Sequence, residues 1–262
     1  MALSLSFVLC SDDLGFLAPG IRDFLAASWP TLPRASNFLE VGNTLAFDIG
    51  AAHVVLGRVA EPFPWSDLAG PCATSVIWPE ARSVLQRHRA HVIVSLSSDL
   101  ELIDRAKLLT QVTAAAMAAN PSALGAFWGN ATLVVPKALF IEFAVQILPL
   151  APPLHIWLDI RVAKNADGSC SGFTTGMAAL GHMEFETQNS TQSPEALRER
   201  LLALANYVLE NGPVISDGNT VGADANEKIR VVFADSTFGH PERVMRLIYE
   251  SNKPAKPFWK IW

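Results

Sequence analysis

The stretch His155–Ala163 reads HIWLDIRVA and determines the fold class of the second half of the chain. Its aliphatic residues from 156 to 162 stand at every second position and alternate with His155, Trp157, Asp159 and Arg161, which is typical of a strand with one buried face. Asn165–Ser169 then supplies turn chemistry, because Asn, Asp and Gly tolerate the backbone angles of tight turns. Two further strands are predicted at Gly172–Met177 and Met183–Thr187. The second half therefore begins as a sheet of short strands that turns connect.

A helix is predicted after these strands. Ser193 is a good N-cap, and Pro194 fits the first helical position, where no backbone N–H is needed. Asn211–Gly212 is a typical helix end. The apolar stripe of this helix comprises Leu197, Leu201, Leu204 and Val208. Another strand is predicted at Lys228–Ala234. These strands and helices predict an α+β fold of two layered halves, in which mixed or antiparallel sheets are packed by helices.

The first half shows the same kinds of element. Its predicted strands are Leu3–Cys10, Thr44–Ile49, His53–Val59 and Ala90–Leu96. A helix is predicted from Ser98 to Asn120, with Ser98 and Glu101 forming a capping box in which each side chain accepts a free backbone N–H.

A run of prolines separates the two halves. Pro149, Pro152 and Pro153 follow one another closely, and proline interrupts both helices and strands. We place a domain boundary there, between an N-terminal α+β domain at 1–150 and a C-terminal α+β domain at 151–262.

Composition excludes several classes of protein. Half of the 262 residues are apolar and 17% are charged, which supports a sizeable core and argues against long disordered tracts. The net charge of -5 argues against a general nucleic-acid binder and favours a basic protein partner. The three widely spaced cysteines indicate neither a disulfide framework nor a zinc site. We expect a cytoplasmic protein, because the apolar N-terminal run lacks the basic residues of a secretion signal and no stretch is a good membrane span.

Sequence motifs for catalysis are weak. The chain has no phosphate-binding loop and no dinucleotide fingerprint, and the nearest match to a hydrolase elbow, Gly168–Gly172, lies in the predicted turn. We therefore expect a protein that is not an enzyme and that needs no cofactor or metal. The aromatic stretch Phe258–Trp262 is expected to dock against the folded chain.

One polar cluster stands out. His182, Glu184 and Glu186 point to one face of the predicted strand, with Met183 and Phe185 buried beneath. We interpret this strip as a solvated edge that serves as an interaction surface for a basic partner. The alternative is a metal-assisted hydrolase that uses the imidazole and the two carboxylates.

Residues 175–186, TGMAALGHMEFE, and the loop 216–220, SDGNT, resemble an uncharacterised bacterial domain family, domain of unknown function 4261, over about 174–249. The stretches HRAHVIV at 88–94 and Phe127–Trp128 are similar to what usually precedes that domain. Members occur among the immunity proteins of type VI secretion effectors, and the chain looks similar to one that neutralises a nuclease toxin. The family offers no catalytic residues to transfer.

The resemblance implies an immunity protein that binds and inhibits a cognate toxin, a basic nuclease, by stoichiometric contact, without touching nucleic acid or membrane. The expected partner-binding residues are Glu184, Glu186, His182 and Asp217. Besides the hydrolase, a structural adaptor of a secretion system remains an alternative.

Overall fold

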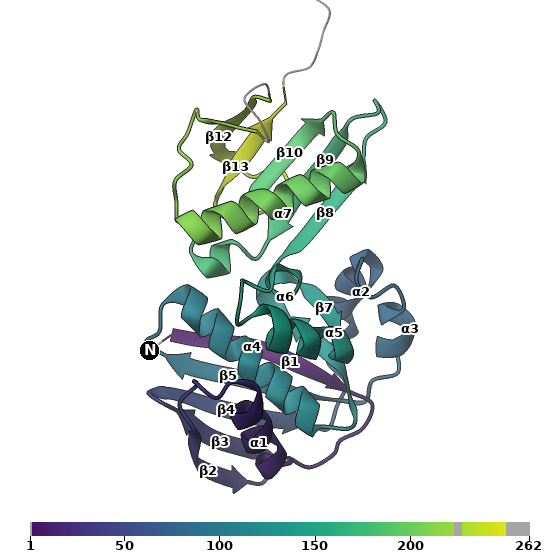
Figure 1. The fold of residues 1–262 in the computed structure, drawn as a ribbon. Coiled ribbons are helices and arrows are strands. Elements are labelled where there is room, and N and C mark those ends of the chain that lie inside the picture. The colour runs from purple at the N-terminus through teal and green to yellow at the C-terminus, as the bar shows by residue number, and fades with distance from the viewer. Residues whose placement is uncertain (1, 223–226, 250–262) are drawn as a thin grey trace, which may run out of the picture. The chain divides into compact units, whose positions relative to one another are not determined.

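The computed structural model describes residues 2–222 and 227–249, so the stretch Phe258–Trp262 lies outside the described residues (Figure 1). Two compact units make up the chain. The first comprises Met1–Asp159 together with Thr175–Gly181, and the second comprises Ile160–Thr174 together with His182–Trp262. The first unit thus continues past residue 150 and also takes a short segment from the second half. Both units combine sheets and helices, which confirms the predicted α+β class.

The first unit is built on a seven-stranded sheet in the order β2-β3-β4-β5-β1-β6-β7. Every neighbouring pair in it is antiparallel. The strands are β1 (Ala2–Cys10), β2 (Ala35–Val41), β3 (Thr44–Ile49), β4 (Ala52–Val59), β5 (Ala90–Ser98), β6 (Ala123–Trp128) and β7 (Leu133–Pro136). Four of them, β1, β3, β4 and β5, confirm strands that the sequence predicted.

Helices α1 (Ala18–Ser28) and α4 (Leu102–Ala119) cover one face of this sheet (Figure 1). A hydrogen bond of 2.6 Å between the hydroxyls of Ser6 and Thr113 joins β1 to α4. Shorter helical pieces complete the unit: α5 (Lys137–Glu142), a π-helical turn (Phe143–Ile147), α6 (Leu154–Trp157) and the 3-10 turns Gly129–Ala131 and Ala178–Leu180.

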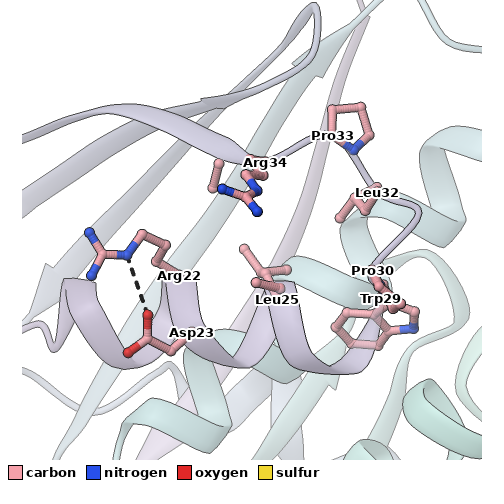
Figure 2. A pocket seen from close by; sticks show the side chains of 10 residues that line it. Arg22, Asp23, Leu25, Trp29, Pro30, Leu32, Pro33 and Arg34 are labelled. Atoms are coloured by element: carbon pink, nitrogen blue, oxygen red, sulfur yellow. Dashed lines mark hydrogen bonds and ion pairs between the residues drawn. The ribbon is translucent and has the colours of Figure 1, made fainter.

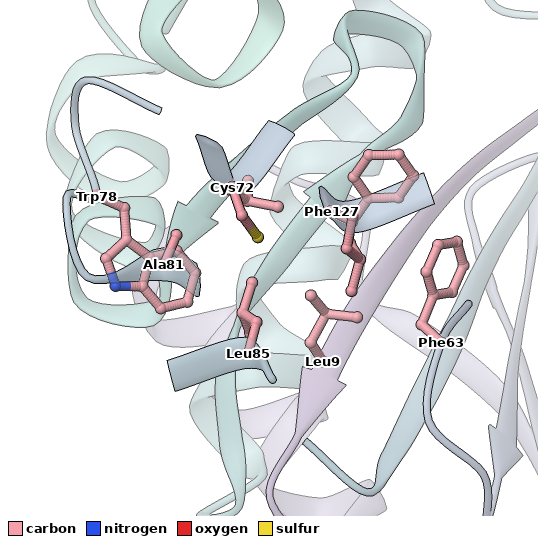
Figure 3. Packing of buried hydrophobic residues seen from close by; sticks show 9 residues of the cluster. Leu9, Phe63, Cys72, Trp78, Ala81, Leu85 and Phe127 are labelled. Carbon is pink, nitrogen blue, oxygen red and sulfur yellow. The ribbon is translucent and has the colours of Figure 1, made fainter. Parts of the chain in front are cut away.

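The opposite face is covered at one side, where α2 (Trp65–Thr74) and α3 (Ala81–Leu85) pack on β1, β6 and β7. Figure 3 shows this cluster, whose buried members include Leu9 and Phe127 from the sheet and Cys72, Leu85 and Trp78 from the segment of α2 and α3. Gly125 on β6 leaves room for the indole, since a Cβ atom there would lie 2.6 Å from Trp78 Cζ3 and would also meet the Val135 carbonyl.

The second unit holds a six-stranded sheet in the order β11-β12-β13-β10-β9-β8. β10 pairs in parallel with β13 and antiparallel with β9. Helix α7 (Pro194–Asn211) lies across one face (Figure 1). The strands are β8 (Asp159–Lys164), β9 (Cys170–Thr175), β10 (Phe185–Ser190), β11 (Thr220–Val221), β12 (Ile229–Asp235) and β13 (Arg243–Ile248).

The limits of α7 confirm the prediction from its capping residues. Ser193 Oγ accepts the Ala196 N–H at 3.2 Å, and Gly212 takes a positive φ of 78° after the last turn. The predicted turn at Asn165–Ser169 is also confirmed, with the Asn165 N–H donating to the Ser169 carbonyl at 2.8 Å.

Two predicted element starts are wrong. The strand expected from His155 begins only at Asp159, because Pro153 starts the helical turn α6 and the Leu158 N–H donates to the Leu154 carbonyl at 2.8 Å. The capping box is wrong as well. Ser98 is the last residue of β5, opposite Ala2 of β1, and α4 begins at Leu102 without a side-chain cap. Pairing with β1 keeps Ser98 in the sheet and moves the helix start along the chain.

Candidate functional site

Glu186, one of the predicted contact residues, lies inside the second unit. Its side chain is fully buried, and its carboxylate is paired with the Arg246 guanidinium, with Oε1 2.8 Å from Nη2 and 3.1 Å from Nε. The Thr237 N–H and the Ser236 hydroxyl also donate to this carboxylate, at 3.2 and 3.1 Å. Glu186 is therefore the anion of an internal network rather than part of a solvated surface.

Glu184 is also withdrawn from solvent, at 5% exposure. The Thr174 hydroxyl donates to its Oε2 at 2.7 Å, and its carbonyl accepts the Met245 N–H at 2.8 Å. The solvated acidic strip predicted at His182, Glu184 and Glu186 is therefore wrong for both carboxylates. Period-two spacing placed them on one face, but it could not reveal the donors that other strands and loops bring to them, Thr174 to Glu184 and Arg246 to Glu186.

His182 and Asp217 retain some access to solvent. His182 is half-buried just before β10, burial lowers the pKa of its imidazole, and its Nδ1 makes no hydrogen bond to any described residue. Asp217 is exposed and accepts the Phe233 N–H at 2.7 Å, so it also holds the 216–219 turn against β12. Within residues 2–222 and 227–249, no group of three or more His, Cys, Asp or Glu side chains is arranged to hold a metal ion. Of the four predicted contact residues, Glu184 and Glu186 are therefore buried, and only His182 and Asp217 keep access to solvent.

An exposed sheet face in the first unit is the feature that the sequence reasoning missed. We call it the open face: three rows of residues that cross β1, β5, β4, β3 and β2, away from α1 and α4. All of its members are at least partly exposed, whereas Ser6, Val94 and Val54 of the alternate set are buried. The rows are Leu3, Ser97, His53, Asp48 and Ser36; Leu5, Ser95, Val55, Ala46 and Leu39; and Phe7, Ile93, Gly57, Thr44 and Val41.

Eight of the fifteen residues of the open face are apolar. Leu3 is 64% exposed, Leu39 62% and Val41 66%. Large apolar side chains that share one exposed patch are uncommon on monomeric proteins and mark interaction sites. The signal was present in β1, where leucines at 3 and 5 leave the sheet on the side opposite Ser4 and Ser6. Such a strand has apolar groups on the face that the helices do not cover.

Three polar side chains form a fixed group at one end of the open face. The Asp48 carboxylate accepts the Asn37 amide at 2.8 Å and lies 2.7 Å from His53 Nδ1. These hydrogen bonds lower the pKa of Asp48, Asn37 being the larger cause. Asn37 has a positive φ of 55° where the register of β2 shifts, so the backbone adopts an uncommon angle to deliver this amide. The group presents His53 at a defined orientation beside the apolar rows.

Charge is uneven between the two units. The first holds 9 basic and 13 acidic residues, and the second holds 11 and 12, so the first carries -4 of the net -5. A basic molecule would thus be drawn mainly toward the unit that bears the open face.

Residues 173–248 match the model of a family described as a domain of unknown function (DUF4261). The match spans 76 of the 262 residues and lies mostly in the second unit. No curated protein and no solved structure is significantly similar to the chain. Among the helices of the described residues, none combines the length and hydrophobicity that a membrane span requires.

Proposed function

We propose that this chain is a binding protein that inhibits a toxin by stoichiometric contact, and that the open face is the surface through which it binds. The toxin would be a type VI secretion effector, a basic nuclease, as the resemblance of residues 174–249 to immunity-associated domains implies. The carrying observation is the exposed apolar sheet face, with Leu3, Leu39 and Val41 each more than 60% exposed.

The geometry of the open face suits the centre of a protein interface. Five strands at about 4.8 Å spacing and three rows about 7 Å apart give a patch of a few hundred square ångströms. Standard interfaces bury about 800 Å² on each partner, with an apolar core and a polar rim. The rows that begin at Leu5 and Phe7 hold most of the apolar residues and would form that core. The row that begins at Leu3 also contains His53 and Asp48, which would lie at its rim.

The main partner contacts are thus on the open face rather than at the four residues that the sequence predicted. Glu184 and Glu186 are buried and hydrogen-bonded to their own chain, so neither is accessible to a partner in this conformation. His182 and Asp217 remain accessible and are retained as secondary contacts. The negative charge of the first unit raises the rate of association with a basic toxin, an effect that salt weakens.

The test is co-purification with the toxin encoded beside this chain, together with rescue of cells that express that toxin. The double substitution Leu39→Arg and Val41→Arg places two cations on the open face at exposed positions. We expect it to abolish co-elution and rescue while leaving the urea unfolding midpoint unchanged. Leu150→Arg is the matched control, since Leu150 is 86% exposed and lies outside the open face.

Three results would count against the proposal. Failure of the unmodified chain to bind or protect against that toxin would reject the toxin-inhibitor function. Binding that survives the double substitution would reject the open face as the surface. Binding to secretion machinery in cells that lack the toxin would favour an adaptor.

A further inference from the structure

A cavity of about 640 Å³ lies in the first unit, at the end of the sheet beside α4. Its walls come from four places: the α1–β2 connector at Leu32–Pro33, the β3–β4 turn at Ile49–Ala52, the end of β5 and the connector after it at 98–100, and the first half of α4 around Leu108. This volume falls in the range of small-molecule sites, which are mostly apolar with a few placed polar groups. The cavity lies on the helix-covered side of the sheet, so it is distinct from the open face.

Ser98 is the polar group at the inner wall of this cavity. It is 1% exposed, and its hydroxyl makes no hydrogen bond to any described residue. In β5 it has the same facing as Leu96 and Val94, toward the side that α4 covers. A buried hydroxyl without a partner is costly, and the cost disappears when a ligand supplies the missing hydrogen bond.

The charges around the cavity limit what it can accept. Its ionisable lining groups are Asp99, Asp104 and Lys107, and the Lys107 ammonium donates to the Asp104 carboxylate at 2.9 Å. The lining is thus net negative by one charge. Arg22 and Arg34 line a neighbouring groove of about 390 Å³ that shares Leu32 and Pro33 (Figure 2), and neither lines the cavity.

We propose that this cavity binds a small, mostly apolar molecule whose single polar head is uncharged or cationic and hydrogen-bonds to the Ser98 hydroxyl. The apolar body lies against Leu32, Ile49 and Leu108, and the head reaches Ser98. Anionic heads are disfavoured by the net charge of the lining. This site is independent of the proposed toxin binding.

The test uses 1-hexanol, hexylamine and hexanoate, which share one apolar body and differ in the charge of the head. Titration of the full chain is followed by amide NMR shifts. We expect saturable shifts near Gly50, Ser98 and Gln111 with the alcohol and the amine, and at least ten-fold weaker binding of hexanoate. Ser98→Ala should weaken binding of the alcohol several-fold.

Matched variants separate specific binding from partition into the protein. Ala51→Phe adds a ring at an exposed turn position that lines the cavity, and it should abolish the shifts. Ala60→Phe adds the same ring at an exposed position outside the cavity and should leave them unchanged. The proposal is overturned if no probe saturates, if Ala51→Phe binds like the unmodified chain, or if hexanoate binds as well as hexylamine.

Discussion

Glu186 is the residue whose surroundings differ most from what the sequence suggested. The fully buried carboxylate is balanced by Arg246, and removing one member of a buried pair leaves the other charge uncompensated. The Arg246 side chain is 22% exposed, which reduces the free-energy cost of leaving its charge unpaired. We expect Glu186→Ala to lower the free energy of unfolding of the second unit by about 2–3 kcal/mol, measured by urea denaturation.

Glu199→Ala is the control for this substitution. Glu199 is an exposed carboxylate on α7, and its loss should change stability by less than about 0.5 kcal/mol. If Glu186→Ala retained full stability and lost only partner binding, the internal role assigned to Glu186 would be incorrect.

The thiol of Cys10 makes the stability of the first unit depend on pH. Burial is the main cause that raises the pKa of its thiol to about 11 from an ordinary 9.0. The unfolded chain therefore releases this proton near pH 9 while the folded chain retains it, so stability falls as pH rises between about 9 and 11. The slope is at most about 1.4 kcal/mol per pH unit.

Cys10→Ala should remove this contribution. The difference in unfolding free energy between the unmodified chain and the variant should be constant below pH 8 and should shrink above pH 9. Urea titrations at pH 7, 8, 9.5 and 10.5 measure it. A difference that stays constant over the whole range would mean that the thiol ionises equally in both states.

At the scale of elements, two serines that look alike in the sequence have different roles. Ser193 Oγ caps α7, whereas Ser98 ends β5 and its hydroxyl has no described partner. We expect Ser193→Ala to cost about 1 kcal/mol. Ser98→Ala should leave stability unchanged or increase it, because it removes an unsatisfied buried hydroxyl.

Urea denaturation of both variants checks this contrast, and hydrogen exchange in the first turn of α7 should increase for Ser193→Ala alone. If Ser98→Ala reduced the helicity of α4, Ser98 would be the helix cap that the sequence predicts, and its assignment to β5 would be incorrect. The contrast has a clear physical source: Ser193 follows a strand that has ended, whereas Ser98 is still paired with Ala2 across the sheet.

The elements that the sequence predicted well are those with local determinants. Apolar, β-branched and aromatic residues mark β1, β3 and β4, and the Ser193-Pro194 and Asn211-Gly212 pairs define α7. The start of β8 was misjudged because Pro153 imposed a helical turn on an alternating stretch. The candidate site was less predictable still, since burial of Glu186 depends on residues 50 to 60 positions later in the chain.

At the scale of the whole molecule, the matched family segment and the structural units do not coincide. Residues 173–248 include Thr175–Gly181, which belongs to the first unit. Met177 in that segment is fully buried. We expect Met177→Ala to destabilise the first unit by about 2–5 kcal/mol, although the residue lies in the second half of the sequence.

Hydrogen exchange measured by mass spectrometry distinguishes the units. Met177→Ala should reduce protection in β1 and β5, and the matched control Met245→Ala, 3% exposed in β13, should reduce it in β10 and β12. Loss of protection in β10 on Met177→Ala, with β1 unaffected, would assign this segment to the other unit.

The parallel pairing of β10 with β13 has a consequence for how the chain is made. Phe185 lies opposite Met245, so the central strand β10 cannot pair with β13 until the residues sixty positions later have been translated. The backbone N–H and C=O groups on that edge of β10 have no partner from β13 while the ribosome adds α7 and β12. Closing the loop of about sixty residues between the two strands is slow. During synthesis, the sheet of the second unit therefore stays incomplete, with apolar surface exposed, until β13 has been made.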